Sequence, residues 1–521
     1  MLSFGYDIDF RHNFSFLESS GILHEPTRVC KPRKPEMDDT TFLQTYPFKN
    51  KPFLHQQVYL QRFWRQDVAA LFADMGTGKS YMLLNNIAML YDRGGINAAL
   101  IVAPKGVYRN WVSQEIPKHM PAHILYRVGL WNASPRKAEQ LSIDSLFEIT
   151  DDLKILIMNI EALSTKKGTS FANRFLNAHN AMMAIDESTT IKNSSAARSK
   201  NAVTIGGKAR FRRILTGSPI TKSPMDLFQQ CAFLSYGCLG QASFYGFQNR
   251  YALVIERRVS SHSFRQVVGY QRMDELGDKL TAFSFRIRKE DCLDLPDKVY
   301  TRREVGLTPD QTRVYNQMKD LALAQFSAGM TSTTNALTQM MRLHQIVCGH
   351  TKLDDGTVVE IANNRVQELV DTLEEFDGKA IIWASYRHDI ESIRLTLQKI
   401  YGMNAVATYY GDTTDDERQD VITRFQDPNS ELRFFVGNPR TGGYGITLTE
   451  ASLVIYYSNS FDLEVRLQSE DRAHRIGQTK KVTYVDLISP GTIDEKIVQA
   501  LRNKINIAGA VLKEDIKTWL I

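Results

Sequence analysis

The chain has 521 residues, and its 64 Lys and Arg residues against 58 Asp and Glu residues give a net charge of +6. At roughly 100–200 residues per domain, this length predicts about two to four domains. With 43% hydrophobic and 23% charged residues, the composition excludes a wholly disordered chain, a collagen-like fibre and a long coiled coil. No apolar run approaches the about 18 residues that span a bilayer, and the N-terminus lacks the pattern of a secretion signal.

The five cysteines are scattered and form no CxxC pair. They predict free thiols in a reducing compartment rather than a disulfide frame or a zinc site. A surplus of six positive charges is compatible with nucleic acid binding but does not require it. We therefore expect a soluble, intracellular protein of several domains.

Residues 1–45 are punctuated by Pro and carry a basic cluster at Arg28, Lys31, Arg33 and Lys34, which predicts a small N-terminal extension. Residues 46–226 alternate short apolar runs with amphipathic segments, as parallel α/β domains do. Five of the runs have the length of strands: Val68–Ala73, Ala98–Ala103, Ile155–Met158, Ala181–Ile185 and Arg213–Thr216. In open parallel sheets the active residues follow the carboxyl ends of the strands, so the loops after these runs are candidate sites.

The strongest local signal begins at the end of the first run, in the segment Ala73-Asp-Met-Gly-Thr-Gly-Lys-Ser80. It lies between a predicted strand and a segment with a helical apolar face, which is the context of a phosphate-binding loop. Its glycines permit a tight loop whose backbone N–H groups point at phosphate, Lys79 can reach the β- and γ-phosphates, and Ser80 can hold Mg²⁺. We assign five residues to ATP binding: Gly76, Thr77, Gly78, Lys79 and Ser80.

Asp186 and Glu187 follow the apolar run Ala181–Ile185. Downstream of a phosphate loop, such an Asp can bind the Mg²⁺ of the nucleotide, and the adjoining Glu can polarise the attacking water. An isolated pair of this kind is as often a capped surface turn. The phosphate loop upstream favours the catalytic interpretation.

Residues 227–364 are richer in Gln than the segments on either side and contain long helical patterns at Asp310–Phe326 and Thr334–Ile346. We predict a mainly helical insertion and linker in this region. Residues 365–500 repeat the α/β pattern, and residues 501–521 are expected to form a C-terminal helix. The strand-length runs of this second lobe are Ala380–Ala384, Ala405–Tyr410, Leu432–Val436, Leu453–Tyr457 and Val482–Ile488, and the helical patterns are Val366–Phe376 and Asp415–Phe425. The predicted fold class is α/β, with two parallel-sheet lobes joined by the insertion.

The third signal is Gln468-Ser-Glu-Asp-Arg-Ala-His-Arg-Ile-Gly-Gln478, near the end of the second lobe. Arg472 and Arg475 are three residues apart, so on a helix they would share one face. Two guanidinium groups presented in this way could stabilise the charge on a transferred phosphoryl group. An isolated segment of this type is usually a solvated helix face, and the phosphate loop shifts the interpretation toward function.

These segments together resemble the SWI/SNF-like family of superfamily 2 helicase-type ATPases, from about residue 48 to residue 500. Asp186-Glu-Ser-Thr189 stands where the family has DEAH or DEGH, so Ser188 and Thr189 replace a small residue and a His. Further matches are Val102–Trp111, Lys192-Asn193, Leu215–Ile220, Arg286–Pro296, Leu337–His350, Ile381–Tyr386, Thr441–Leu448 and Gly491–Glu495. The resemblance implies two RecA-like lobes with ATP and Mg²⁺ bound between them.

Site residues also follow from the resemblance. It implies that Gln56 contacts adenine, that Gln468 belongs to the nucleotide site, and that Arg472 and Arg475 act as arginine fingers. The predicted catalytic set is Lys79, Asp186, Glu187, Arg472 and Arg475, with Ser80 and Asp186 as metal ligands. Contacts to the nucleic acid, mostly to phosphate, are predicted for Lys105, Asn110, Lys192, Ser385 and Thr441.

The function that the resemblance implies is a DNA-dependent ATPase that translocates on double-stranded or branched DNA, remodelling junctions or displacing bound proteins in DNA repair or recombination. One alternative is a strand-separating helicase, whose wedge would come from residues 1–45 or from the insertion. Another is an ATP-driven remodeller of a protein partner, such as a polymerase, that uses DNA as a foothold. We expect a cytoplasmic protein of a bacterial or phage-infected cell, with a nuclear location left open.

Overall fold

The computed structural model describes residues 39–259, 262–292, 295–327, 333–353, 355–411, 413, 415–441 and 446–512. Most of the predicted N-terminal extension and residues 513–521 of the predicted C-terminal helix lie outside these ranges. The described part of the extension contains helix α1 (Asp39–Thr45). Among the described residues, every helix is too short or too polar to span a membrane.

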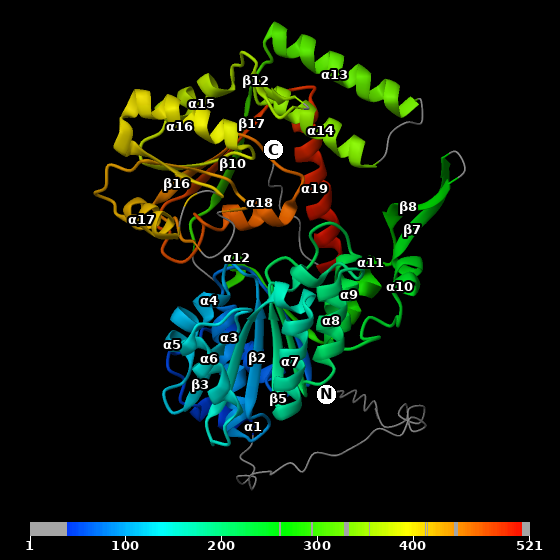
Figure 1. Cartoon of the computed structure of the whole chain (residues 1–521), viewed down its shortest axis with the longest axis vertical. Coiled ribbons are helices and arrows are strands. Elements are labelled where there is room, and N and C mark those ends of the chain that lie inside the picture. Colours follow the sequence, from blue (N-terminus) through cyan, green and yellow to red (C-terminus); the bar gives the residue numbers. More distant parts are fainter. Residues whose placement is uncertain are drawn as a thin grey trace, which may run out of the picture. The chain divides into compact units, whose positions relative to one another are not determined.

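The first lobe is built on a seven-stranded sheet in which all paired strands run parallel (Figure 1). Its order is β3 (Tyr126–Leu130), β4 (Leu153–Asn159), β2 (Ala98–Ala103), β5 (Ala181–Asp186), β6 (Phe211–Thr216), β1 (Val68–Ala73) and β9 (Ser284–Ile287). Five of these strands coincide with the predicted apolar runs, and β3 and β9 at the two edges were not predicted.

Both faces of this sheet are buried, which explains why its central strands are apolar at successive positions. Along β1, Leu71 packs into one core cluster and Phe72 into the other, on the opposite face. The covering helices are α2 (Leu54–Phe63), α3 (Lys79–Asp92), α4 (Tyr108–Asn110), α5 (Ile116–His119), α6 (Lys137–Asp144), α7 (Lys166–Ala178), α8 (Ala197–Gly206) and α9 (Asp226–Leu234).

The second lobe has a six-stranded sheet, again with parallel pairing throughout. Its order is β10 (Lys298–Glu304), β17 (Val482–Ile488), β16 (Ala451–Tyr456), β13 (Lys379–Trp383), β15 (Phe434–Gly437) and β14 (Val406–Tyr409). Its helices are α15 (Arg365–Glu374), α16 (Arg387–Tyr401), α17 (Asp415–Gln426) and α18 (Leu463–Glu470). The predicted fold class, two parallel-sheet lobes of the α/β type, is therefore confirmed.

The region between the lobes is mainly helical, as predicted, but it also contains strands. Its helices are α10 (Phe244–Tyr251), α11 (Met273–Thr281), α12 (Lys289–Cys292), α13 (Pro309–Ser327) and α14 (Thr333–Val347). Strands β7 (Ala252–Val259) and β8 (His262–Tyr270) form an antiparallel hairpin and, among the described strands, pair only with each other. Strands β11 (His350–Lys352) and β12 (Val358–Glu360) form a second small pair.

Two segments of the chain pack against both lobes. The linker enters both sheets, because β9 pairs with β1 of the first lobe and β10, a few residues later, pairs with β17 of the second. Helix α19 (Ile493–Leu512) begins in an apolar cluster with α13 and α14 and ends with Val511 in the core of the first lobe (Figure 1). Movement between the lobes must therefore bend the short linker or shift α19.

Candidate active site

The phosphate loop connects β1 to α3 and has the backbone that its glycines predict. Gly76 and Gly78 have φ angles of +86° and +91°, in the left-handed region that favours glycine. A Cβ atom at Gly78 would also lie 2.3 Å from Nε2 of Gln56, so a side chain here would displace the Gln56 amide as well as strain the backbone. The loop leads into the N-terminus of the 14-residue helix α3, where free backbone N–H groups favour an anion.

Two polar side chains bind backbone carbonyl groups of the phosphate loop. The ammonium group of Lys79 donates to the carbonyl oxygen of Ala73 at 3.0 Å. Nε2 of Gln56, a buried residue of α2, donates to the carbonyl oxygen of Thr77 at 3.2 Å, while its Oε1 accepts from the backbone N–H of Phe53. The structure thus places Gln56 directly against the phosphate loop, and its contact with adenine stays a prediction.

Asp186 is the last residue of β5, and both of its carboxylate oxygens accept hydrogen bonds. The indole Nε1 of Trp111 donates to Oδ2 at 3.1 Å, and the backbone N–H of Glu187 donates to Oδ1 at 3.0 Å. Burial raises the pKa of Asp186, and the positive charge of Lys79 opposes this rise. Carboxylate and hydroxyl oxygens are ligands that Mg²⁺ accepts, so the half-buried Asp186 and Ser80 are of the right chemical kind for the predicted metal site.

Glu187 is held in an uncommon backbone conformation beside Asp186. Its φ angle is +48°, which non-glycine residues rarely adopt and which marks functional sites in many folds. Thr216, at the end of β6, donates its hydroxyl to Oε2 of Glu187 at 3.3 Å. Burial raises the pKa of Glu187 to about 7, Lys79 lowers it, and the charges of Asp186 and Glu464 raise it. A group with this pKa is suited to accept a proton from water near neutral pH.

The substitution Glu187→Gln keeps the size of the side chain but removes its basicity. We expect the variant to bind ATP with nearly the affinity of the wild type and to hydrolyse it about a hundredfold or more slowly. Equilibrium binding of ATP and steady-state hydrolysis measure the two effects separately. Normal turnover would mean that another residue positions the water.

The contact from Trp111 was not predicted, although Trp111 ends the segment Val102–Trp111 that matches the family. Trp111 is buried and begins a short π-helical turn (Trp111–Glu115), a local geometry that is frequent at functional sites. Because its N–H group orients Asp186, it supports a metal ligand from outside the metal's own coordination sphere.

The substitution Trp111→Phe removes the N–H donor and retains an aromatic ring. We expect the Mg²⁺ concentration that half-saturates ATP hydrolysis to rise about tenfold, since removing such supporting contacts weakens metal binding by that order. A titration of Mg²⁺ at saturating ATP measures the effect, with Trp131→Phe as a control for the loss of a buried indole. An unchanged Mg²⁺ dependence would contradict this role for Trp111.

The two arginines of the second lobe converge, but not on a helix as predicted. Helix α18 ends at Glu470, and Arg472 and Arg475 lie in the turn that follows it. In this turn, the carbonyl oxygen of Arg472 accepts from the backbone N–H of Leu448 at 3.0 Å, and the carbonyl oxygen of His474 accepts from Nζ of Lys289 in the linker at 2.8 Å. Both guanidinium groups nevertheless donate from Nη1 to the carbonyl oxygen of Ile446, each at 3.3 Å.

This turn lies against the phosphate loop. A Cβ atom placed on Gly76 would lie 3.9 Å from Cβ of Arg475 and 3.8 Å from Cε of Lys289. Burial, together with the positive charge of Arg475, lowers the pKa of Arg472 to about 10. An anion at the phosphate loop would relieve this unfavourable burial of positive charge. The structure therefore brings Lys79, Asp186, Glu187, Arg472 and Arg475 to the facing sides of the two lobes.

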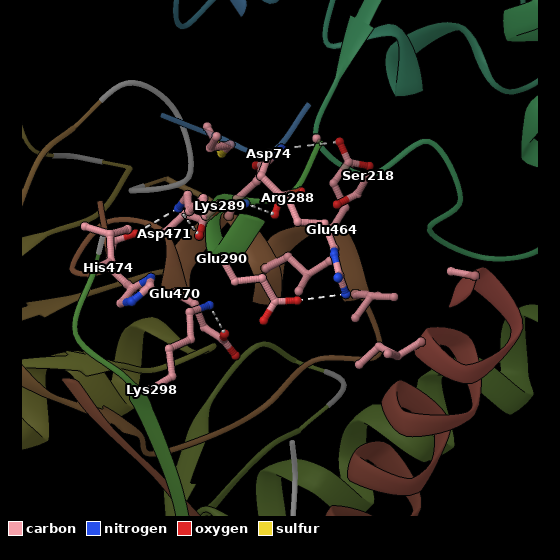
Figure 2. A pocket seen from close by; sticks show the side chains of 18 of the residues that line it. Asp74, Ser218, Arg288, Lys289, Glu290, Lys298, Glu464, Glu470, Asp471 and His474 are labelled. Atoms are coloured by element: carbon pink, nitrogen blue, oxygen red, sulfur yellow. Dashed lines mark hydrogen bonds and ion pairs between the residues drawn. The ribbon is translucent and has the colours of Figure 1, made fainter. Parts of the chain in front are cut away.

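The linker residue Lys289 connects these two sides. Its backbone N–H donates to Oδ2 of Asp74 in the phosphate loop, and its ammonium group forms a 2.5 Å ion pair with Asp471 beside the arginines (Figure 2). Arg286, three residues earlier, donates to the other oxygen of Asp74 at 3.0 Å. The linker segment was predicted from the resemblance, but neither acidic partner was, since nothing in the local sequence indicates these contacts.

A cavity of about 1000 Å³ lies between the lobes next to this site (Figure 2). The first lobe lines it with Asp74, Glu187 and Thr216, and the second lobe lines it with Gln468 and Asp471. The amide of Gln468 donates within α18 to Glu464 at 3.4 Å. The predicted role of Gln468 in nucleotide binding stays a prediction.

The five residues predicted to contact nucleic acid lie in three places. Lys105 is exposed after β2, and Asn110 is half-buried in α4. In the second lobe, Ser385 and Thr441 are linked through Asn438, whose side chain donates to the carbonyl oxygen of Ser385 and whose own carbonyl accepts from the N–H of Thr441. Lys192 is held between the lobes by Thr221 and Glu464.

Comparison with known proteins agrees with this architecture. The model of the SNF2-related domain matches residues 55–353, and the model of the helicase conserved C-terminal domain matches residues 362–477. The ISWI chromatin-remodeling complex ATPase CHR11 of Arabidopsis thaliana is 26% identical over 477 residues, which are 88% of this chain and 42% of that protein. An uncharacterized ATP-dependent helicase of Mycoplasma pneumoniae is 26% identical over 447 residues, 85% of this chain and 40% of that protein.

Among solved structures, the Sulfolobus solfataricus SWI2/SNF2 ATPase core in complex with dsDNA is 25% identical, with a TM-score of 0.40, over 90% of this chain and 95% of that one. The chain spans about two fifths of the length of the two curated relatives. The match of the SNF2-related domain covers more than half of the chain. The chain therefore belongs to the SNF2-related family of ATPases and helicases.

Proposed function

We propose that this protein is a DNA-dependent ATPase motor that translocates on double-stranded or branched DNA and thereby remodels junctions or displaces bound proteins. The observation that carries the proposal is the arrangement of the interlobe site. The phosphate loop and the pair Asp186 and Glu187 come from one lobe, and the arginine pair comes from the other, with Arg472 buried and Arg475 close to Gly76. The names of the relatives, a chromatin-remodeling ATPase and an ATP-dependent helicase, support a motor that acts on DNA.

The proposed chemistry assigns one task to each group. Lys79 leaves the carbonyl of Ala73 and binds the β- and γ-phosphates of ATP. Ser80 and Asp186 hold Mg²⁺, which when bound neutralises part of the phosphate charge. Glu187 orients the attacking water and accepts its proton, and Arg472 and Arg475 stabilise the charge that spreads over the transferred phosphoryl group.

The proposed movement follows from the division of this site between two lobes. Hydrolysis requires the arginines to reach the γ-phosphate, so the lobes close on ATP and open after hydrolysis. The linker and α19 limit the motion, because each is packed into both lobes. Alternate closing and opening then moves the lobes along a strand, through contacts of Lys105, Asn110, Ser385 and Thr441 that bind phosphate and weaken with salt.

A strand-separating helicase is the second candidate, and the hairpin β7–β8 favours it. The hairpin pairs with no other described strand and projects from the insertion beside α10 (Figure 1). It carries exposed apolar side chains at Leu253, Ile255 and Val268. Apolar side chains of this kind can separate stacked bases.

The test is steady-state ATP hydrolysis with no DNA, with single-stranded DNA, with blunt duplex and with a four-way junction. We expect strong stimulation by the duplex or the junction, and none in the variant Lys79→Ala. Stimulation by single strands alone, together with strand displacement from a forked duplex, would favour the helicase. Hydrolysis that no DNA stimulates would contradict the proposed motor.

A further inference from the structure

We propose that Glu464 of helix α18 is an interlobe positioning residue. Its carboxylate couples the position of the second lobe to the turn after Glu187, through Thr189, and to the segment that contains Thr221, through Lys192. The inference rests on the proposed ATPase function and deepens it. It concerns the two residues, Ser188 and Thr189, at which this chain departs from the pattern of its family.

Both substituted residues are buried hydroxyls with defined partners. Ser188 is fully buried and Thr189 is 3% exposed. Ser188 donates to Oε1 of Gln230 on α9 at 2.8 Å, and the amide of Gln230 donates in turn to the carbonyl oxygen of Pro219 at 2.8 Å. One side of the turn after Glu187 is therefore fixed within the first lobe.

The other side of the turn is fixed by the second lobe. The hydroxyl of Thr189 donates to Oε1 of Glu464 at 2.7 Å, a contact between residues 275 positions apart in the chain. The second oxygen of the same carboxylate accepts from Nζ of Lys192 at 3.0 Å. Lys192 also donates to Oγ1 of Thr221 at 2.6 Å, and the side chain of Asp226 accepts from the hydroxyl of Thr221. One carboxylate thus joins the turn after Glu187 to the segment after Pro219.

Glu464 is suited to this role by its place on a short, rigid element. It lies in the first turn of the eight-residue helix α18, where a negative charge is favourable and where Asp462 caps the helix. The same helix leads directly into Arg472 and Arg475 at its other end. Any displacement of α18 that moves the arginines relative to the phosphate loop also changes the contact of Glu464 with Thr189.

Glu187 is the residue that such a displacement would affect. It lies two positions before Thr189, and its left-handed backbone is maintained only by the contacts around it. When the lobes separate, Thr189 loses its acceptor in the second lobe, and the turn keeps only its contacts within the first lobe, such as those of Ser188 with Gln230 and of Glu187 with Thr216. In this account, Glu187 activates water efficiently only in the arrangement of the lobes in which α18 also holds Arg472 and Arg475 close to the phosphate loop.

The test compares substitutions that remove or retain the hydroxyl and the carboxylate. Thr189→Val removes the hydroxyl, Thr189→Ser retains it, and Glu464→Ala removes the carboxylate. We expect Thr189→Val and Glu464→Ala each to lower duplex-stimulated kcat about tenfold, in the range of contacts within one hydrogen-bond network, with the KM for ATP unchanged. Thr189→Ser should retain the wild-type kcat. The double variant that combines Thr189→Val with Glu464→Ala should show no larger decrease in kcat than Glu464→Ala alone.

The control is Thr204→Val on the exposed side of α8, whose hydroxyl donates only within its own helix; it should behave as the wild type. Additive losses in the double variant, or a wild-type kcat in Thr189→Val, would overturn the role of Glu464. A wild type that duplex DNA fails to stimulate would overturn the proposed function itself. A loss confined to thermal stability, with kcat unchanged, would show that the contact is only structural and would also overturn the inference.

Discussion

The variant Lys79→Ala should retain less than about a thousandth of the wild-type rate of ATP hydrolysis, because it removes a charged donor from the transferred phosphates. DNA binding should be retained, since Lys79 points into its own loop and contacts the carbonyl of Ala73. Steady-state hydrolysis and equilibrium binding of a labelled duplex measure the two properties on the same preparation.

The exposed Lys105 of the same lobe provides the matched control for Lys79. Lys105→Ala should weaken DNA binding and raise the DNA concentration needed for stimulation, while hydrolysis at saturating DNA stays near that of the wild type. Substantial hydrolysis by Lys79→Ala would contradict the assignment of the phosphate loop.

The variant Arg475→Ala should lower kcat by about a thousandfold or more, the range measured for arginine fingers. Its affinity for ATP should change by less than about threefold, because Arg475 reaches the phosphates only when the lobes close. In the structure its guanidinium donates to Ile446 within its own lobe, and its Cβ approaches Gly76. Single-turnover hydrolysis and ATP binding measure the chemical step and the affinity separately.

Arg424→Ala is the control for this substitution, since Arg424 is an exposed arginine of the same lobe that pairs only with Asp420 on α17. It should hydrolyse ATP at the wild-type rate. A change in nucleotide affinity without a change in kcat would mean that Arg475 binds the ground state and is not an arginine finger.

The features that could be predicted from the sequence are local. Strands such as β1 and β5 are buried on both faces, so they are apolar at successive positions and end at a polar loop. The phosphate loop is equally local, because Gly76 and Gly78 are required by the backbone of the loop itself. Helices α13 and α14 follow their apolar periodicity closely.

The features that could not be predicted depend on contacts between distant segments. On a helix, Arg472 and Arg475 would share one face, but they lie in a turn whose carbonyls bind distant segments. The carbonyl of Arg472 accepts from the N–H of Leu448, and that of His474 accepts from the ammonium group of Lys289 in the linker. Strand β9 has only four residues, and its pairing with β1 defines it. The hairpin β7–β8 lies in a region whose composition suggested helices, and its pairing overrides that weak propensity.

The central claim is that ATP hydrolysis moves the protein along duplex DNA, and displacement of a third strand from a triplex tests it most directly. A short third strand bound to one end of a duplex is released when a motor translocates through it, without separation of the duplex strands. We predict ATP-dependent release by the wild type, none by Lys79→Ala, and a duplex that stays paired throughout. Duplex-stimulated hydrolysis with the third strand left in place would contradict translocation.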